Sequence, residues 1–180
     1  MADEKDKKEP WLNYLALTTV ILAVCATLST FRGGSYSTRA VLSQTQAANQ
    51  WSYYQSKSIK GYIYEVQKEE IEAQIKANAA AWPPATATIY RDLIADFTQQ
   101  IARYDGEKAK IQADAKELET RRDHAQAHSR TFGMAVIFLQ IAILMSSVSA
   151  LMKKKPLWIL GSALGCVGLF YFITGLLMPS

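Results

Sequence analysis

The chain has 180 residues, 49% of them apolar, and a formal net charge of +4. Its charged residues are unevenly distributed, because the segments 10–31, 131–152 and 156–180 contain none. Residues 32–130 hold 14 basic and 12 acidic side chains, a balance that is typical of a solvated helical surface and argues against nucleic-acid binding.

The three uncharged segments predict three membrane-spanning helices. Each has about 20 residues or more, enough for an α-helix to cross about 30 Å of hydrocarbon. We assign residues 1–10 to a cytoplasmic tail, and residues 11–31, 131–152 and 156–178 to the three transmembrane helices. No Asp, Glu, Lys, Arg or His lies in any span, which argues against a transporter or proton pump.

A lysine turn separates the second and third spans and predicts the orientation of the chain. Lys153, Lys154 and Lys155 fill this short loop, and short loops rich in lysine stay on the cytoplasmic side of a membrane. The N-terminus is therefore expected in the cytoplasm. The long block between the first and second spans is expected on the other side.

Residues 35–130 are predicted to form a long antiparallel helical hairpin outside the membrane. Gly33 and Gly34 are expected to break the helix after the first span, so that Ser35 or Ser37 caps a new one. The tip is placed at residues 81–86, where a Pro-Pro pair stops the first arm. Thr86 or Thr88 is then expected to cap the second arm.

The two predicted arms carry seam residues at alternating steps of four and three, the spacing of a coiled coil. On the second arm this spacing continues into the second span without a phase change. Residues that face each other should have numbers that total about 167 if the tip lies at Pro83 and Pro84. The predicted seam comprises Ile59, Ile63, Val66 and Ala73 on the first arm, and Tyr90, Ile94, Phe97, Ile101, Tyr104, Ile111 and Leu118 on the second.

Small residues on the opposite face of the second arm predict a contact between subunits. Glycine in a helix interior costs about 1 kcal/mol relative to alanine, so Gly106 indicates close approach by another backbone. Gly61 is expected at the same height on the first arm, pointing away from its seam. The alternative is that alanine is simply the best helix former. The predicted oligomer interface comprises Gly61, Ala95, Ala102, Gly106, Ala109 and Ala113.

Three glycines predict close helix packing in the third span. Gly161, Gly165 and Gly168 lie on one side of this helix, and small residues let membrane helices approach each other. The alternative is the ordinary enrichment of glycine in membrane helices.

Two further groups suggest binding sites. His124 and His128 are four residues apart, so they share a helix face and could bind a metal with ligands from elsewhere, the alternative being a solvated face. The uncharged polar residues around Trp51 suggest a protein interface, the alternative being aromatic side chains that fill the base of the hairpin. No phosphate loop, nucleophile elbow or paired-carboxylate motif is present, so neither an enzyme activity nor a cofactor is expected.

The runs 44–48 and 49–60, together with the second span and its lysine turn, resemble the bacterial membrane proteins grouped as domain of unknown function 4337. The resemblance implies a three-span protein of the bacterial inner (plasma) membrane and implies no activity. With the orientation expected from the lysine turn, the hairpin would lie in the periplasm. We thus expect an all-α integral membrane protein in contact with lipid, with three transmembrane helices and a long antiparallel coiled-coil hairpin.

Two functions remain open from the sequence. The first is a homo-oligomeric structural or scaffolding assembly of periplasmic coiled-coil hairpins. The second is an oligomeric channel or pore lined by uncharged polar residues of the spans, either Thr18, Thr19, Thr27 and Thr30, or Gln140 with Ser146, Ser147 and Ser149.

Overall fold

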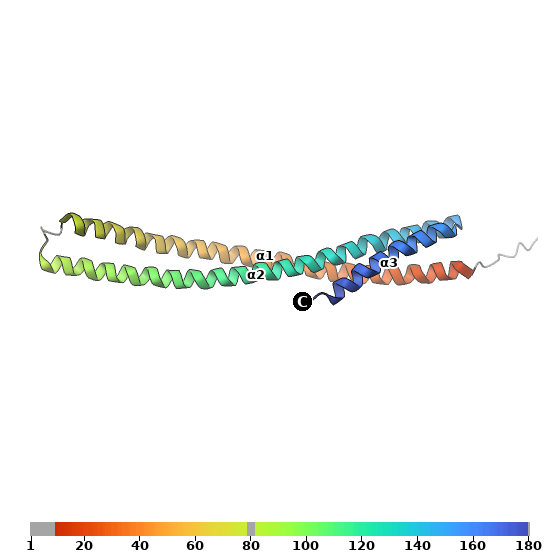
Figure 1. The fold of residues 1–180 in the computed structure, drawn as a ribbon, viewed down its shortest axis with the longest axis horizontal. Coiled ribbons are helices and arrows are strands. Elements are labelled where there is room, and N and C mark those ends of the chain that lie inside the picture. Colours follow the sequence, from red (N-terminus) through yellow and green to blue (C-terminus); the bar gives the residue numbers. More distant parts are fainter. Residues whose placement is uncertain (1–9, 79–81, 180) are drawn as a thin grey trace, which may run out of the picture. The chain divides into compact units, whose positions relative to one another are not determined.

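The computed structural model describes residues 10–78 and 82–179. These residues form three helices, α1 (Pro10–Asn78), α2 (Pro84–Met152) and α3 (Lys155–Leu177) (Figure 1). The chain is all-α, as predicted. The first nine residues of the predicted tail, and Ala81 at the predicted tip, lie outside the described residues.

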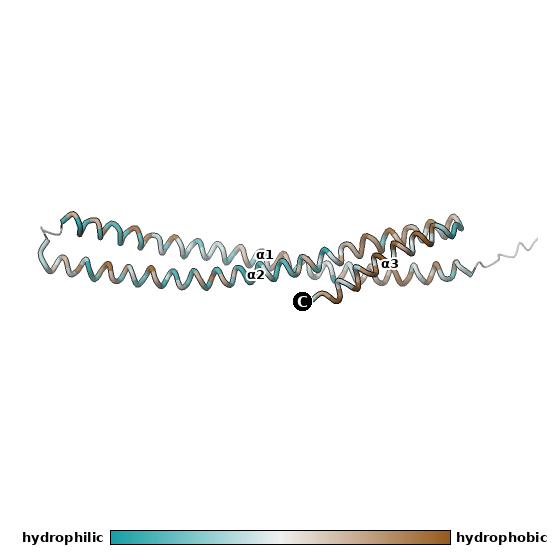
Figure 2. The backbone as a smooth tube through the Cα atoms, viewed as in Figure 1, coloured by the Kyte–Doolittle hydropathy of each residue, from teal (hydrophilic) through white to brown (hydrophobic). Residues whose placement is uncertain are grey.

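The helices divide into two compact units. The first unit contains α1 up to Val41, α2 from Arg122, and α3, whereas the second contains residues 42–121. All three helices are long and apolar enough to cross a membrane. Their most hydrophobic stretches belong to the first unit (Figure 2). Length and composition therefore support the three predicted spans.

The predicted break after the first span is wrong. α1 is one helix of 69 residues that passes through Gly33 and Gly34. A Cβ at Gly33 would lie 3.1 Å from Cβ of Phe132, so this glycine lets α1 and α2 approach closely. The contact offsets the low helix propensity of glycine, which costs about 1 kcal/mol per residue. Ser35 and Ser37 are accordingly interior residues of α1 and cap no helix.

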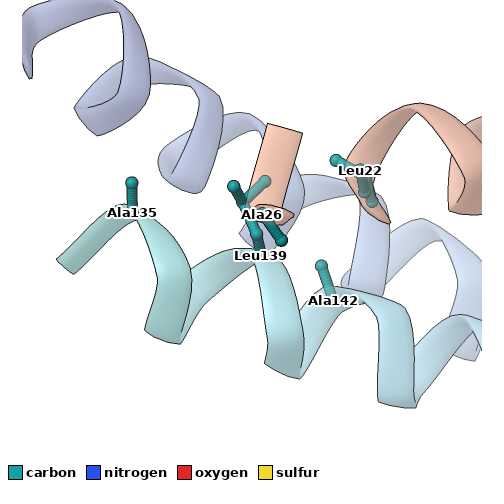
Figure 3. Close-up of a cluster of buried hydrophobic side chains, with 5 residues drawn as sticks. All are labelled: Leu22, Ala26, Ala135, Leu139 and Ala142. Atoms are coloured by element: carbon teal, nitrogen blue, oxygen red, sulfur yellow. The ribbon is translucent and has the colours of Figure 1, made fainter. Parts of the chain in front are cut away.

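The first unit has a core of small and large apolar side chains from α1 and α2. Leu22, Ala26, Ala135, Leu139 and Ala142 are buried together (Figure 3). The alanines leave room for Leu139, which is fully buried. Tight interdigitation of this kind holds membrane helices together where lipid removes the hydrophobic driving force.

α3 packs through the glycines identified in the sequence. A Cβ at Gly161 would lie 3.1 Å from Cβ of Met145, and one at Gly165 would lie 3.0 Å from Cδ1 of Leu22. One at Gly168 would lie 2.7 Å from Cγ of Leu139. All three glycines are buried, as is Gly175. This is the close approach to α1 and α2 expected from the sequence.

The lysine turn joins α2 to α3 with little excess chain. Lys153 has a φ of 51°, in the left-handed region that commonly ends a helix. Ser149 Oγ donates a hydrogen bond of 2.8 Å to the carbonyl of Lys154. A proline in the first turn then starts α3, where its missing N–H has no partner to lose.

In the second unit the two arms lie side by side and antiparallel (Figure 1). α2 begins at Pro84, and the carbonyl of Pro83 accepts hydrogen bonds from the N–H groups of Thr86 and Ala87. The predicted caps at Thr86 and Thr88 are therefore wrong, since both residues lie inside the first turns. Near the tip, the rings of Trp82 and Tyr90 stack with centroids 4.5 Å apart.

The predicted seam of α2 is confirmed. Its seven predicted residues are all buried or half-buried, from Tyr90 to Leu118. The same spacing continues in the first unit, where Phe132 and Leu139 are fully buried.

The predicted seam of α1 is wrong by two residues. Ile59, Ile63 and Val66 are 57%, 50% and 45% exposed, and Ala73 is also exposed. A shift of two residues turns a helix by about 200°, so the predicted stripe faces away from α2. The observed inner stripe comprises Ala47, Gln50, Tyr54, Lys57, Gly61, Tyr64, Lys68, Ile71 and Ile75.

The predicted position of Gly61, on an outer face of α1, is also wrong. A Cβ at Gly61 would lie 3.4 Å from Cβ of Tyr104, so Gly61 is buried between the arms. Tyr64 packs nearby against Phe97 and Tyr104, with ring centroids 5.6 and 5.8 Å away. Gly61 is therefore part of the contact with α2, and the predicted pairs of Val66 with Ile101 and Ile63 with Tyr104 do not form.

Candidate functional site

A cluster around Lys57 is the main polar contact between the arms of the hairpin. Lys57 Nζ lies 2.6 Å from Glu107 Oε2, and 5.4 and 5.5 Å from the ring centroids of Tyr53 and Tyr104. Arg103, one turn away on α2, holds the other oxygen of Glu107 at 2.9 Å. The ammonium thus lies between a carboxylate and two aromatic faces, both of which attract a cation.

The charges of this cluster stabilise each other. The hydrogen bond from Lys57 is the main cause that lowers the pKa of Glu107, followed by the one from Arg103. The same bond with Glu107 is the main cause that raises the pKa of Lys57. Both groups therefore remain charged at neutral pH. The cluster is suited to setting the register of the arms, and it lacks the poised proton that acid–base catalysis requires.

The aromatic residues around Trp51 divide between the two faces of α1. Trp51 is half-buried, donates a hydrogen bond of 2.9 Å to Glu119, and meets the ring of Tyr54 edge-on at 5.6 Å. Tyr53 is half exposed. Trp51 and Tyr54 therefore fill space between the arms, as the second interpretation of this stretch expected. A protein partner here stays a prediction that rests on the exposed residues.

The two histidines have different environments. His128 is buried, stacks on Tyr36 with centroids 4.3 Å apart, and donates from Nε2 to the carbonyl of Pro179 at 3.1 Å. His124 is exposed, so only His124 fits the predicted solvated face. Among the described residues, no group of three His, Cys, Asp or Glu side chains could hold a metal. Within the part of the chain that the structure describes, the pair has no further ligands, so metal binding stays a prediction.

The hydroxyl groups of the first span satisfy their own hydrogen bonds. Thr19, Thr27 and Thr30 each donate to the carbonyl four residues earlier in α1. Thr18 donates to Leu15 and accepts from the indole of Trp158. Side chains bonded in this way need no water, so their presence alone gives little support to a channel.

The polar residues of the second span do not form one stripe. Ser146 and Ser149 are buried inside the bundle, whereas Gln140 and Ser147 are exposed on its surface. Ser147 donates to the carbonyl of Ile143. The side-chain amide of Gln140 makes no hydrogen bond to another of the described residues. Gln140 lies at the middle of the span, where hydrocarbon would surround it.

The small residues of the predicted oligomer interface on α2 are all exposed: Ala95, Ala102, Gly106, Ala109 and Ala113. No atom of the described chain lies within 4 Å of a Cβ built at Gly106. The face is thus accessible to another molecule. Its role in assembly stays a prediction.

Sequence reasoning missed Tyr36, Lys57 and Glu107. In the first unit, Tyr36 meets His128 in the register of Gly33 with Phe132. In the second unit, Lys57 meets Glu107 in the register of Gly61 with Tyr104. The predicted register, in which facing residue numbers total about 167, is off by two or three residues and could not have identified these contacts. Residue type alone carried no signal, since lysine and glutamate are common on solvated helices.

Comparison with protein families identifies the family of this chain. No curated protein and no solved structure matches the chain. A family model described as a domain of unknown function covers residues 11–178, nearly the whole chain and both units. The protein therefore belongs to the family named domain of unknown function (DUF4337).

Proposed function

We propose that this protein is a homo-oligomeric scaffold of the bacterial plasma membrane, whose spans associate in the bilayer and whose hairpins assemble on the periplasmic side. Its role is structural and needs no catalytic group or cofactor. The lysine turn supports this orientation, because short loops rich in lysine stay cytoplasmic.

Gln140 is the observation that carries the proposal of self-association. Its amide is exposed at mid-span. An unsatisfied amide in hydrocarbon costs several kcal/mol, and polar side chains in spans commonly bond across helices. The same residue of a neighbouring copy lies at the same depth and can both donate to it and accept from it.

The bonding pattern of the spans favours a scaffold over a pore. The threonines proposed to line a channel bond within their own helix, and Ser146 and Ser149 are buried within one chain. A water-filled path would need a polar face that continues along the whole span. Gln140 and Ser147 are the exposed residues of the second-span set, and they do not form such a face.

Replacing Gln140 tests the proposal. We expect Gln140→Leu to shift the purified protein from an oligomer towards a monomer, as measured by light scattering with correction for detergent. Ser147→Leu is the matched control, because Ser147 is also exposed but its hydroxyl is bonded to its own helix. A monomeric wild-type protein would refute self-association. Selective ion flux through reconstituted liposomes, abolished by Gln140→Leu, would instead favour the pore.

A further inference from the structure

α1 carries a second stripe, which faces away from α2 in the hairpin. Ile59, Tyr62, Ile63 and Val66 are 57%, 66%, 50% and 45% exposed. Their spacing is that of a coiled-coil seam, and they lie almost opposite the inner stripe. Four large apolar side chains within about two turns, outside the predicted spans, form an exposed patch of the kind that marks interaction sites.

The same face stays uncharged below this patch. Ala48, Asn49, Ser52, Gln55 and Ser56 are all exposed and carry no charge. The stripe from Ala48 to Val66 is therefore about 28 Å long at 1.5 Å per residue. On the same face, the nearest charged side chain is Glu70, one turn beyond Val66, whereas Lys60 and Glu65 lie on either flank of the stripe.

We propose that this uncharged stripe of α1 binds the same stripe of a second copy, helix parallel to helix. The inference rests on the proposed function, because copies in one membrane share orientation and depth. Around a two-fold axis along the membrane normal, each residue of the stripe then meets its own counterpart.

Charge selects this partner face. A surface that meets its own copy at equal height places identical charges together, which costs free energy unless the surface is uncharged. The outer face of α2 carries Asp96, Arg103 and Lys110, so its own copy would repel it. The α1 stripe carries no charge between Ala48 and Val66, so over this length it avoids the conflict.

Side-chain shape and area agree with a parallel pair. Ile59 and Val66 are seven residues apart, so these two β-branched residues share one position of a coiled-coil heptad. A stripe about 28 Å long on a helix about 10 Å wide buries on the order of 300 Å² per copy. A standard soluble interface buries about 800 Å² per partner. The hairpin contact therefore supplements contacts between the spans.

Disulfide trapping tests the geometry in the full-length protein in native membranes. Cys25→Ala and Cys166→Ala remove the only two cysteines, which lie in the predicted spans. Ile59→Cys and Val66→Cys are then introduced singly and oxidised mildly. We expect each to yield a dimer, because identical positions face one another within disulfide reach. Lys60→Cys, about 100° around the helix, is the matched control and should remain monomeric.

Four other results of these experiments would overturn the proposed α1 contact. A monomeric Ile59→Cys in a protein that light scattering shows to be oligomeric overturns the α1 contact and leaves the proposed function standing. Cross-linking only when Ile59→Cys is combined with Gly106→Cys assigns the contact to α2 of the neighbour and also overturns it. Equal cross-linking of Lys60→Cys and Ile59→Cys indicates random collision and overturns it too. A monomeric wild-type protein overturns both proposals.

Discussion

Glycines in this chain have different roles, which depend on what a side chain at each position would meet. At Gly168, a Cβ would lie 2.7 Å from Cγ of Leu139 and 3.0 Å from its backbone nitrogen, which cannot move without the helix. At Gly133, no atom of the described chain lies within 4 Å of a Cβ. The first glycine is therefore required for packing, and the second is not.

Alanine substitution separates these two roles. We expect Gly168→Ala to destabilise the bundle by about 1 to 3 kcal/mol, the typical cost of overpacking a core. Gly133→Ala should instead leave stability unchanged or raise it by up to about 1 kcal/mol, through helix propensity. Thermal unfolding followed by circular dichroism in detergent measures both. Equal effects of the two variants would show that the contact between Gly168 and Leu139 does not hold α3 in place.

At the scale of the element, α1 is defined by two stripes with the same spacing. The inner stripe contains Gly61, which lets the backbone approach Tyr104, and Lys57, which pairs with Glu107. The outer stripe holds more aliphatic residues, including Ile59 and Val66. The observed pairing therefore satisfies aromatic and charged contacts with α2 and leaves the aliphatic residues exposed.

The contact between Lys57 and Glu107 predicts how the stability of the hairpin varies with pH. Glu107 has a lowered pKa in the folded protein, so its contribution is complete above the ordinary value of 4.5 and is lost as pH falls through the folded value. Lys57 has a raised pKa, so its contribution is complete below 10.5 and is lost as pH rises through the folded value. The pair therefore stabilises the hairpin between these limits.

The variant Glu107→Gln tests how the stability of the hairpin depends on pH in the acid range. We expect the variant to have a lower Tm than the wild type at neutral pH, and the difference to vanish at pH values well below 4.5, where Glu107 is protonated in both states. Glu69→Gln, at an exposed position on α1, serves as the control and should match the wild type throughout. A difference in Tm that persists in acid would assign the effect to packing of the side chain.

At the scale of the whole molecule, the central question is the side of the membrane on which the hairpin lies. We predict that Ala85→Cys, near the tip, reacts in intact cells with a thiol reagent that enters the periplasm but not the cytoplasm, in a background without the two native cysteines. Lys154→Cys, in the turn between α2 and α3, should react only after the cells are lysed. The reverse pattern would place the hairpin in the cytoplasm and invert the proposed topology.

The sequence by itself determined the three candidate spans, the two arms and the seam of α2. These features depend on local properties, namely uncharged runs long enough to cross hydrocarbon and one dominant stripe in α2. Helix type needs no knowledge of the partner. The predicted tip was too long, since Pro84, Ala85 and Thr86 belong to α2.

Only the tertiary structure decided which face of α1 meets α2, whether Gly33 and Gly34 end a helix, and where Gly61 and His128 lie. Both stripes of α1 alternate steps of three and four, so periodicity could not show which one meets α2. The two stripes differ by two residues, which places them on nearly opposite faces of the helix. The face of α1 that packs against α2 depended on the free energy of the contacts between the two helices. Among these contacts, Tyr104 meets Gly61 and Glu107 meets Lys57. The continuity of α1 likewise depended on Phe132, about 100 residues away in the chain, packing against Gly33.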